Sequence, residues 1–162
     1  MIENIYLDMD GVLCDFANEA AEKKYLNLKT RKVNWQLLNT EGEKFWENLK
    51  WIDEGKKLYK YLYKYCLSHD INLCILSSIG NEKGRNGKKT WIKNNLKINP
   101  LNIYFVVHGA DKAKYAVENS VLIDDFGKNV DIFIRSGGNA IKFKNDAKEV
   151  INKLEEILTE DY

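Results

Sequence analysis

The residues with the clearest chemical potential are two aspartates one position apart, Asp8 and Asp10, which follow the apolar run Ile5–Leu7. The run has the length of a short buried strand, in which residues i and i+2 point the same way. The two carboxylates therefore project together from the end of the strand, and Gly11 permits a sharp turn behind them. Carboxylates this close repel each other unless a cation or a shared proton lies between them. A simple turn with a helix cap is the alternative interpretation, because Asp and Gly commonly follow strands.

Two further apolar runs also end on polar residues. The run at 71–76 is followed by two serines, and the run at 121–123 by two aspartates. These four residues are Ser77, Ser78, Asp124 and Asp125. In a parallel sheet the carboxyl ends of the strands lie at one edge, so these groups can converge with the first aspartate pair. Four carboxylates at one place call for a hard divalent cation, and an oxygen-only set favours Mg²⁺ over Zn²⁺.

For these side chains to meet, the fold must bring strand ends that are distant in the sequence to one edge of a sheet. Apolar runs of strand length alternate with helical patterns, which is typical of an α/β protein with a doubly wound, Rossmann-like parallel sheet. Five strands are expected near residues 5–7, 71–76, 102–107, 121–123 and 140–143. Helices are expected near 53–69, 90–96, 111–118, 129–135 and 144–160, with a glycine-rich basic loop at 80–89.

The segment of about residues 17–52 has no strand pattern. We expect it to form a small helical cap inserted after the first strand, with helices near 18–28, 33–38 and 43–49. A single proline and no Ser/Gly-rich linker argue against a flexible boundary, so residues 1–162 are predicted to form one domain.

Composition excludes several classes of protein. A formal charge of +1 excludes a generally basic surface that coats duplex DNA. Three cysteines without metal-ligand spacing indicate buried thiols in a reducing compartment. Aspartates interrupt the N-terminal apolar run, and no apolar stretch has the length of a membrane span, so we expect a cytoplasmic protein.

The order of these motifs resembles the haloacid dehalogenase-like superfamily, and more closely its 5'(3')-deoxyribonucleotidase family. Nearly the whole chain takes part in the resemblance. Four segments carry it: Asp8–Phe16; Phe45–Leu49 leading to Glu54 and Gly55; Lys88–Trp91; and Asp111–Lys112 before Leu122–Asp125. The chain departs from the family where Ser77, Ser78 and Ile79 replace the usual Thr-Ser-Pro, and in its shorter helical insert.

The resemblance implies a Mg²⁺-dependent phosphomonoesterase that hydrolyses (deoxy)nucleoside monophosphates through an aspartyl-phosphate. Asp8 would attack phosphorus, and Asp10 would protonate the leaving oxygen and then deprotonate the attacking water. Asp8, the backbone carbonyl of Asp10, and Asp124 would hold Mg²⁺, with Asp125 in support.

The same resemblance suggests the ligands of the substrate. Ser77, with Ser78 beside it, and Lys112 would bind the phosphoryl oxygens. Lys112 is preferred to Lys114 because the family's lysine follows an acidic residue, although either lysine fits. Lys88 would add charge on the phosphate side, whereas Lys83 and Arg85 also fit a solvated loop. Aromatic residues of the insert would either stack on a nucleobase or form the insert's own core: Phe16, Trp35, Phe45 and Trp46.

Other functions remain compatible with the motifs. A short insert leaves the site open, so the substrate could instead be the 3'-phosphate at a nucleic-acid end, or a small phosphorylated metabolite. A non-catalytic phosphate-binding module is the alternative of another class, and the intact set of aspartates opposes it. In each case we expect the protein to bind a phosphate ester and not to associate with a membrane.

Overall fold

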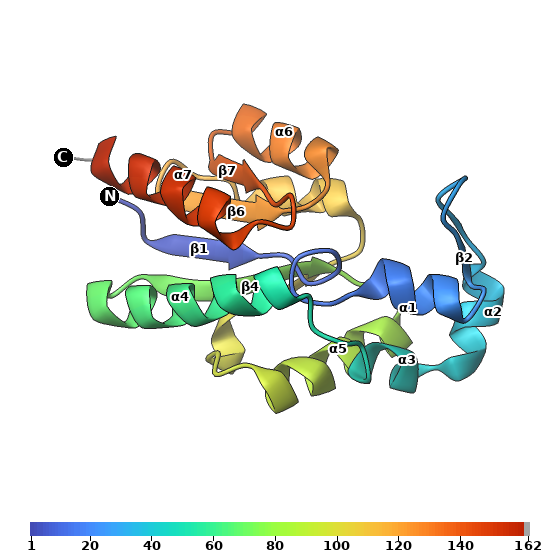
Figure 1. The fold of residues 1–162 in the computed structure, drawn as a ribbon. Coiled ribbons are helices and arrows are strands. Elements are labelled where there is room, and N and C mark those ends of the chain that lie inside the picture. The colour runs from blue at the N-terminus through green and yellow to red at the C-terminus, as the bar shows by residue number, and fades with distance from the viewer. Residues whose placement is uncertain (161–162) are drawn as a thin grey trace.

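The computed structural model describes residues 1–160 (Figure 1). Its centre is a five-stranded sheet in the order β5-β4-β1-β6-β7, in which every neighbouring pair is parallel. The strands are β1 (Asn4–Leu7), β4 (Asn72–Ser78), β5 (Ile103–Val106), β6 (Ser120–Asp124) and β7 (Asn139–Lys142). The predicted parallel α/β sheet is confirmed, with each strand within two residues of its expected bounds.

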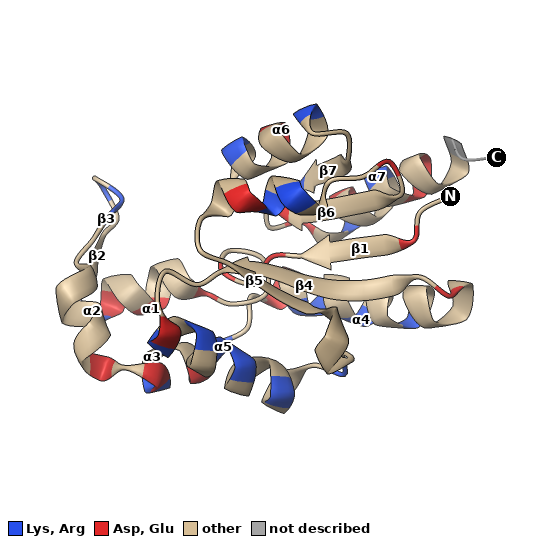
Figure 2. Cartoon of the chain, turned by 180° about the vertical axis from the view of Figure 1, so that it is seen from behind, with Lys and Arg blue, Asp and Glu red and all other residues tan. Residues whose placement is uncertain are grey.

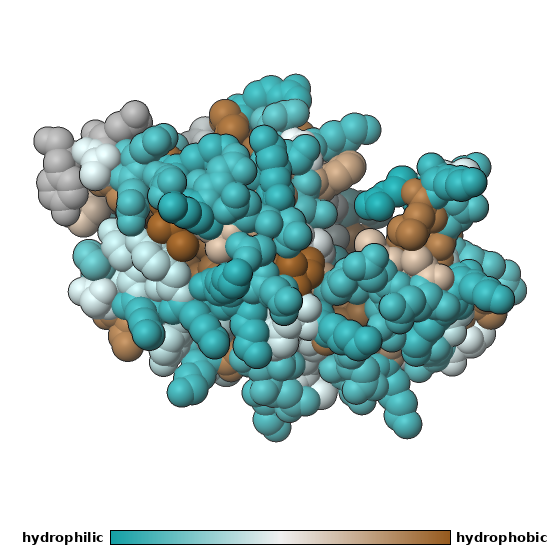
Figure 3. All heavy atoms as spheres, in the orientation of Figure 1, coloured by the Kyte–Doolittle hydropathy of each residue, from teal (hydrophilic) through white to brown (hydrophobic). Residues whose placement is uncertain are grey.

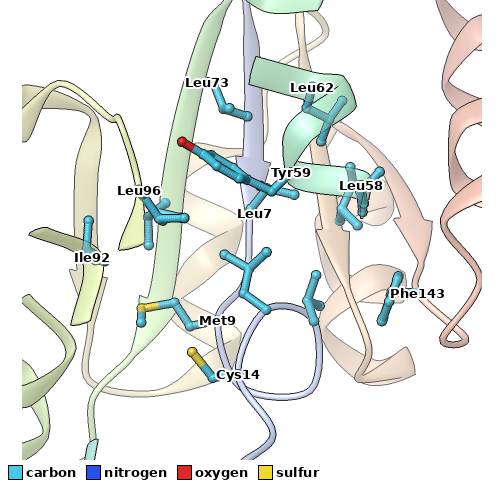
Figure 4. Close-up of a cluster of buried hydrophobic side chains, with 14 of the residues drawn as sticks. Leu7, Met9, Cys14, Leu58, Tyr59, Leu62, Leu73, Ile92, Leu96 and Phe143 are labelled. Atoms are coloured by element: carbon cyan, nitrogen blue, oxygen red, sulfur yellow. The ribbon is translucent and has the colours of Figure 1, made fainter. Parts of the chain in front are cut away.

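Helices cover both faces of the sheet because side chains alternate along each strand. Ile5 and Leu7 face one apolar cluster, and Tyr6 between them faces another. The first face carries α4 (Asp53–His69), α5 (Glu82–Asn95) and α7 (Ala147–Glu160). The second carries α6 (Gly127–Arg135) and the 3-10 helix η2 (Gly109–Tyr115). Figure 4 shows Leu7 among side chains of α4, including Leu58 and Leu62.

Helix α4 illustrates how the sequence builds these layers. Apolar side chains recur every three or four residues, so Leu58, Leu62 and Cys66 are buried on one side. Ile52 is the N-cap of the helix, and Asp53 is its first residue. The carboxylate of Asp53 therefore lies where the helix dipole favours negative charge. The helix ends at His69, and the following residue Asp70 caps it with a left-handed backbone, φ 55°.

The segment between β1 and α4 lies beyond the carboxyl ends of β1 and β4 (Figure 1). It contains α1 (Phe16–Glu22), β2 (Leu26–Asn27), β3 (Lys32–Val33), α2 (Trp35–Glu41) and α3 (Glu43–Glu47), and we call it the insert. The insert contains three helices, as predicted, but it is not helical throughout, because β2 and β3 pair as a short antiparallel hairpin. Two-residue strands carry no detectable alternation. Asn27 closes the hairpin, as its side chain accepts from the backbone amides of Lys29 and Thr30.

The start of α5 also differs from the prediction. The loop predicted for residues 80–89 is helical from Glu82 onward. Asn81 caps this helix, because its side-chain oxygen accepts from the amide of Gly84 at 2.9 Å. Gly84 and Gly87 are both buried, so they mark close packing against neighbours rather than a turn.

Cys14, Cys66 and Cys74 are buried free thiols, as predicted. Among the helices of residues 1–160, none combines the length and apolar character that a bilayer crossing requires. Hydrophilic side chains cover most of the face shown in Figure 3.

Candidate active site

The loop after β1 holds the first aspartate pair in place. The backbone amides of residues 12–14 all donate to the carbonyl of Met9, at 3.2, 2.8 and 2.9 Å, which wraps the loop into one turn. Gly11 has φ 84°, and a Cβ at this position would lie 2.8 Å from Oδ1 of Asp125 and closer still to Oδ2. Only glycine satisfies both the backbone conformation and the close approach of Asp125.

Three of the four carboxylates that were expected to meet converge at the ends of β1 and β6. Asp8, Asp124 and Asp125 each offer an oxygen, and these oxygens lie within 4.8 Å of one another. Lys112 lies between two of them, with Nζ 2.9 Å from Oδ1 of Asp8 and 2.6 Å from Oδ2 of Asp124. Asp8, Lys112 and Asp124 are all buried. Lys114 instead pairs with Asp111 at 3.1 Å on the surface, so Lys112 is the lysine of the site.

Asp124 is held by more donors than the sequence indicates. The amide of Phe126 donates to its Oδ1 at 2.9 Å, and the side-chain amide of Asn129 donates to its Oδ2 at 3.0 Å. Asn129 belongs to no motif that the sequence offered for this site. Its position in the first turn of the helix that directly follows an acidic strand end is the signal that could have identified it.

The acid cluster carries more negative charge than Lys112 neutralises. Burial, and then the charge of Asp124, raise the pKa of Asp8 to about 7. The same two causes raise the pKa of Asp125 to about 6. Burial lowers the pKa of Lys112, but the carboxylates beside it outweigh this effect and raise it to about 12. A divalent cation would relieve this repulsion, and the all-oxygen donor set fits Mg²⁺.

Asp10 does not join the carboxylate cluster through its side chain. Its Oδ2 accepts from Nζ of Lys88 at 2.8 Å. The same ammonium donates to Oγ of Ser77 at 3.0 Å and to the backbone carbonyl of Ser78 at 2.6 Å. Ser77 and Lys88 are each 1% exposed, so both lie beneath the site. Lys88 therefore lies beneath the cleft and not on the surface where the sequence placed it. Its predicted contribution to phosphate binding, like that of the Asp10 carbonyl to a metal site, stays a prediction.

A cleft of about 600 Å³ opens above these groups. Asp8, Asp10 and Ser78 form its base, between the insert and the edge where α6 begins. The insert contributes Phe16, Arg31 and Trp35, and the opposite wall contributes Phe126, Lys128 and Asn129. The cleft is therefore acidic at its base and carries aromatic and basic side chains at its walls. Lys83 and Arg85, which contact Asn39 and Glu82 on α2 and α5, do not line it.

The four aromatic candidates divide into two groups. Phe16 and Trp35 line the cleft with their rings stacked at 6.2 Å between centroids, and Trp35 is 49% exposed. Phe45 and Trp46 are buried and line no part of it. These two rings fill the interior of the insert, which agrees with the expected alternative that its aromatic residues form its own core. The ring of Trp46 stacks on that of Phe16, with ring centroids 5.4 Å apart.

Comparisons with known proteins give matches among solved structures. No protein-family model matches the chain, and no curated protein matches its sequence. A putative beta-phosphoglucomutase from Thermotoga maritima superimposes with a TM-score of 0.57 at 15% identity, over 96% of this chain and 99% of that one. A Had-superfamily hydrolase from Ehrlichia chaffeensis gives 0.53 at 14% identity, over 98% and 99%.

A third similar structure is a had family enzyme from Bacteroides thetaiotaomicron, solved in complex with magnesium and inorganic phosphate. It gives a TM-score of 0.53 at 13% identity, over 90% of this chain and 96% of that one. At such identities the likeness concerns the fold. This chain has the fold of the haloacid dehalogenase-like hydrolases.

Proposed function

We propose that this protein is a Mg²⁺-dependent phosphomonoesterase that works through an aspartyl-phosphate on Asp8. The observation that carries the proposal is the convergence of Asp8, Asp124 and Asp125 around the buried Lys112 at the base of an open cleft. The fold supports it, since one similar structure was solved with magnesium and inorganic phosphate.

Asp8, Asp124 and Asp125 would hold the cation, with the backbone carbonyl of Asp10 as a further oxygen ligand. Asp124 is buried and fixed by three donors, so it offers a rigid oxygen ligand. When bound, Mg²⁺ supplies positive charge that offsets the charge of the phosphoryl oxygens during transfer. Lys112 supplies a second positive charge at the same place, and Ser78 is the serine that the cleft exposes to those oxygens.

The reaction follows from the two aspartates of the first loop. A carboxylate oxygen of Asp8 attacks phosphorus as the ester P–O bond breaks, and the leaving oxygen takes a proton from Asp10. Water then attacks the same phosphorus and gives a proton to Asp10. The bond between phosphorus and Asp8 breaks, which releases inorganic phosphate and restores both side chains.

The walls of the cleft favour a nucleotide as the substrate. Trp35 and Phe126, on opposite walls, are 49% and 54% exposed, and an exposed aromatic ring can stack on a nucleobase. Arg31 lies at the tip of the β2–β3 hairpin, where Figure 2 shows Lys and Arg, and it faces the same cleft as Lys128. We assign the insert as a cap that contributes to base recognition, with (deoxy)nucleoside monophosphates as the substrates.

A second candidate is the 3'-phosphate at a nucleic-acid end. The openness of the cleft favours it, because exposed aromatic and basic side chains line both walls. A longer chain could pass between these walls, whereas a mononucleotide would use one of them.

Phosphate release tests the proposal directly. The purified protein is assayed with Mg²⁺ on dUMP, dTMP and a 3'-phosphorylated oligonucleotide, beside the Asp8→Asn variant. We expect release from the mononucleotides that falls at least about 10³-fold in the variant. Stronger release from the oligonucleotide would replace the mononucleotide with the second candidate. Release that persists in Asp8→Asn would refute the assigned nucleophile.

The role of the cap is tested separately. Trp35→Ala should raise KM for dUMP by roughly tenfold, since stacking of one base contributes about 1–3 kcal/mol. The matched control is Leu37→Ala, because Leu37 is a similarly exposed side chain of α2 that does not line the cleft. An equal change in both variants would remove Trp35 from base recognition.

A further inference from the structure

Lys88 is a buried lysine that the proposed reaction does not use. Its ammonium donates to Oδ2 of Asp10, Oγ of Ser77 and the carbonyl of Ser78, at 2.8, 3.0 and 2.6 Å. A lysine ammonium has three N–H donors, so all of them are engaged. Since the side chain is 1% exposed and does not line the cleft, a phosphoryl group would have to break one of these bonds to reach it.

The contact with Lys88 decides how Asp10 is presented to the cleft. Oδ1 of Asp10 is buried and has no hydrogen-bond partner in the part of the chain that the structure describes. The charge-assisted bond from Lys88 to Oδ2 is therefore the polar contact that orients this carboxyl group. Asp10 itself remains 27% exposed, so it reaches the cleft while Lys88 holds it from the interior.

The same lysine connects Asp10 to the insert. Its Nζ lies 5.0 Å from the ring centroid of Trp46, a distance at which a cation is attracted to the face of an aromatic ring. The preceding residue, Gly87, fixes this approach, because a Cβ there would lie 2.5 Å from Cβ of Trp46 and closer still to the carbonyl oxygen of Glu43. Helix α5 is thus packed directly on α3, and Lys88 extends from that contact to Asp10.

We propose that Lys88 is a positioning residue that fixes the Asp10 carboxyl group for proton transfer and ties its orientation to the insert through Trp46. The inference rests on the proposed function, because the proton that Lys88 helps to place is the one that Asp10 gives to the leaving oxygen. Lys88 itself transfers no proton and touches no substrate.

The dependence of the rate on the leaving group tests this role. An alkyl phosphate such as dUMP releases a poor leaving group that needs the proton of Asp10, whereas 4-nitrophenolate leaves without it. Lys88→Met should lower kcat/KM for dUMP by about 100-fold and for 4-nitrophenyl phosphate by less than about tenfold. The quantity kcat/KM is chosen because it reports the steps up to transfer onto Asp8.

Three control variants separate positioning from other effects. Asp10→Asn should show the same selective loss on dUMP. The double variant Asp10→Asn/Lys88→Met should be no slower than Asp10→Asn alone, since the two residues would act as one unit. Lys89→Met changes the neighbouring exposed lysine and should leave both rates unchanged. If Lys88→Met does not fold, Lys88→Gln is compared in its place, because its amide can still donate to the serine oxygens.

The outcomes are distinct. An equal loss on both esters with a raised KM would mean that Lys88 binds the phosphoryl group, and would overturn the inference. An equal loss with unchanged KM and a lowered thermal midpoint would mean a structural role only, and would overturn it as well. A wild-type protein that hydrolyses neither ester with Mg²⁺ would overturn the proposed function, and the inference with it.

Discussion

Gly11→Ala should disturb the acid cluster without changing any of its charges. Gly11 has φ 84°, and a Cβ there would lie 2.8 Å from Oδ1 of Asp125 and closer still to Cγ and Oδ2. Alanine in this left-handed conformation costs about 1–2 kcal/mol. To restore ordinary contact distances, the Asp125 carboxylate must withdraw by roughly 1 Å.

That displacement sets the expected functional effect. Asp125 is one of three carboxylates whose oxygens lie within 4.8 Å of one another, so its withdrawal removes one side of the cluster. Disturbing the support of a metal site typically costs about 10–100-fold in metal affinity or activity. We therefore expect the Mg²⁺ affinity of Gly11→Ala to fall by about that factor, with kcat falling in parallel.

Gly137→Ala provides the matched control. Gly137 also has a positive φ, 97°, but nothing lies within 4 Å of the position that its Cβ would take. Both variants should lose about 1–2 kcal/mol of unfolding free energy from backbone strain, since alanine is disfavoured at both positions. Only Gly11→Ala should lose Mg²⁺ affinity.

Two measurements are sufficient. Urea unfolding in Mg²⁺-free buffer gives the loss of stability of each variant, and titration calorimetry with Mg²⁺ gives the affinity. If both variants lose similar stability and both keep the wild-type affinity, the contact between Gly11 and Asp125 has no bearing on the metal. The reasoning would then be refuted.

Two further predictions concern the charges of the cluster. Lys112→Ala leaves Asp8 and Asp124 buried without the lysine ammonium that pairs with them, and should lower the unfolding free energy by about 3–5 kcal/mol. The control Lys114→Ala, at an exposed lysine, should change the unfolding free energy by less than about 0.5 kcal/mol. Equal effects in urea unfolding would contradict the buried ion pairs. In Mg²⁺-free buffer the pKa values of Asp8 (about 7) and Asp125 (about 6) exceed 3.8, the ordinary value of an aspartate. The folding stability that these two groups contribute is therefore complete below about pH 4 and is lost as the pH rises through 6 and 7. Mg²⁺ should therefore raise the thermal midpoint more at pH 8 than at pH 5, and an equal rise at both would remove these carboxylates as its ligands.

The strands and the ends that carry the aspartates could be predicted because their signals are local. Ile5 and Leu7 alternate with Tyr6 along β1, and each face of that strand meets a different apolar cluster, as an apolar run predicts for a strand buried on both sides. Asp8 follows that run in the sequence, so its place at the edge of the sheet needed no knowledge of distant residues.

Errors arose where a local signal has two physical meanings. The glycines of α5 indicated a loop, but Gly87 instead allows α3 to approach the helix closely. Nothing in the neighbouring residues distinguishes a glycine that frees the backbone from one that removes a side chain. The β2–β3 hairpin was missed because strands of two residues are too short for any periodicity.

The chain's own motifs thus determine the chemistry that is available: paired carboxylates at strand ends and a lysine that precedes the second pair. The pairing of Lys88 with Asp10, the support of Asp124 by Asn129, and the burial of Trp46 depend on the packing of helices against one another. A local pattern specifies the direction of a side chain relative to its own backbone. Only the packed structure decides which distant group it meets, because that contact joins residues as far apart as Asp10 and Lys88.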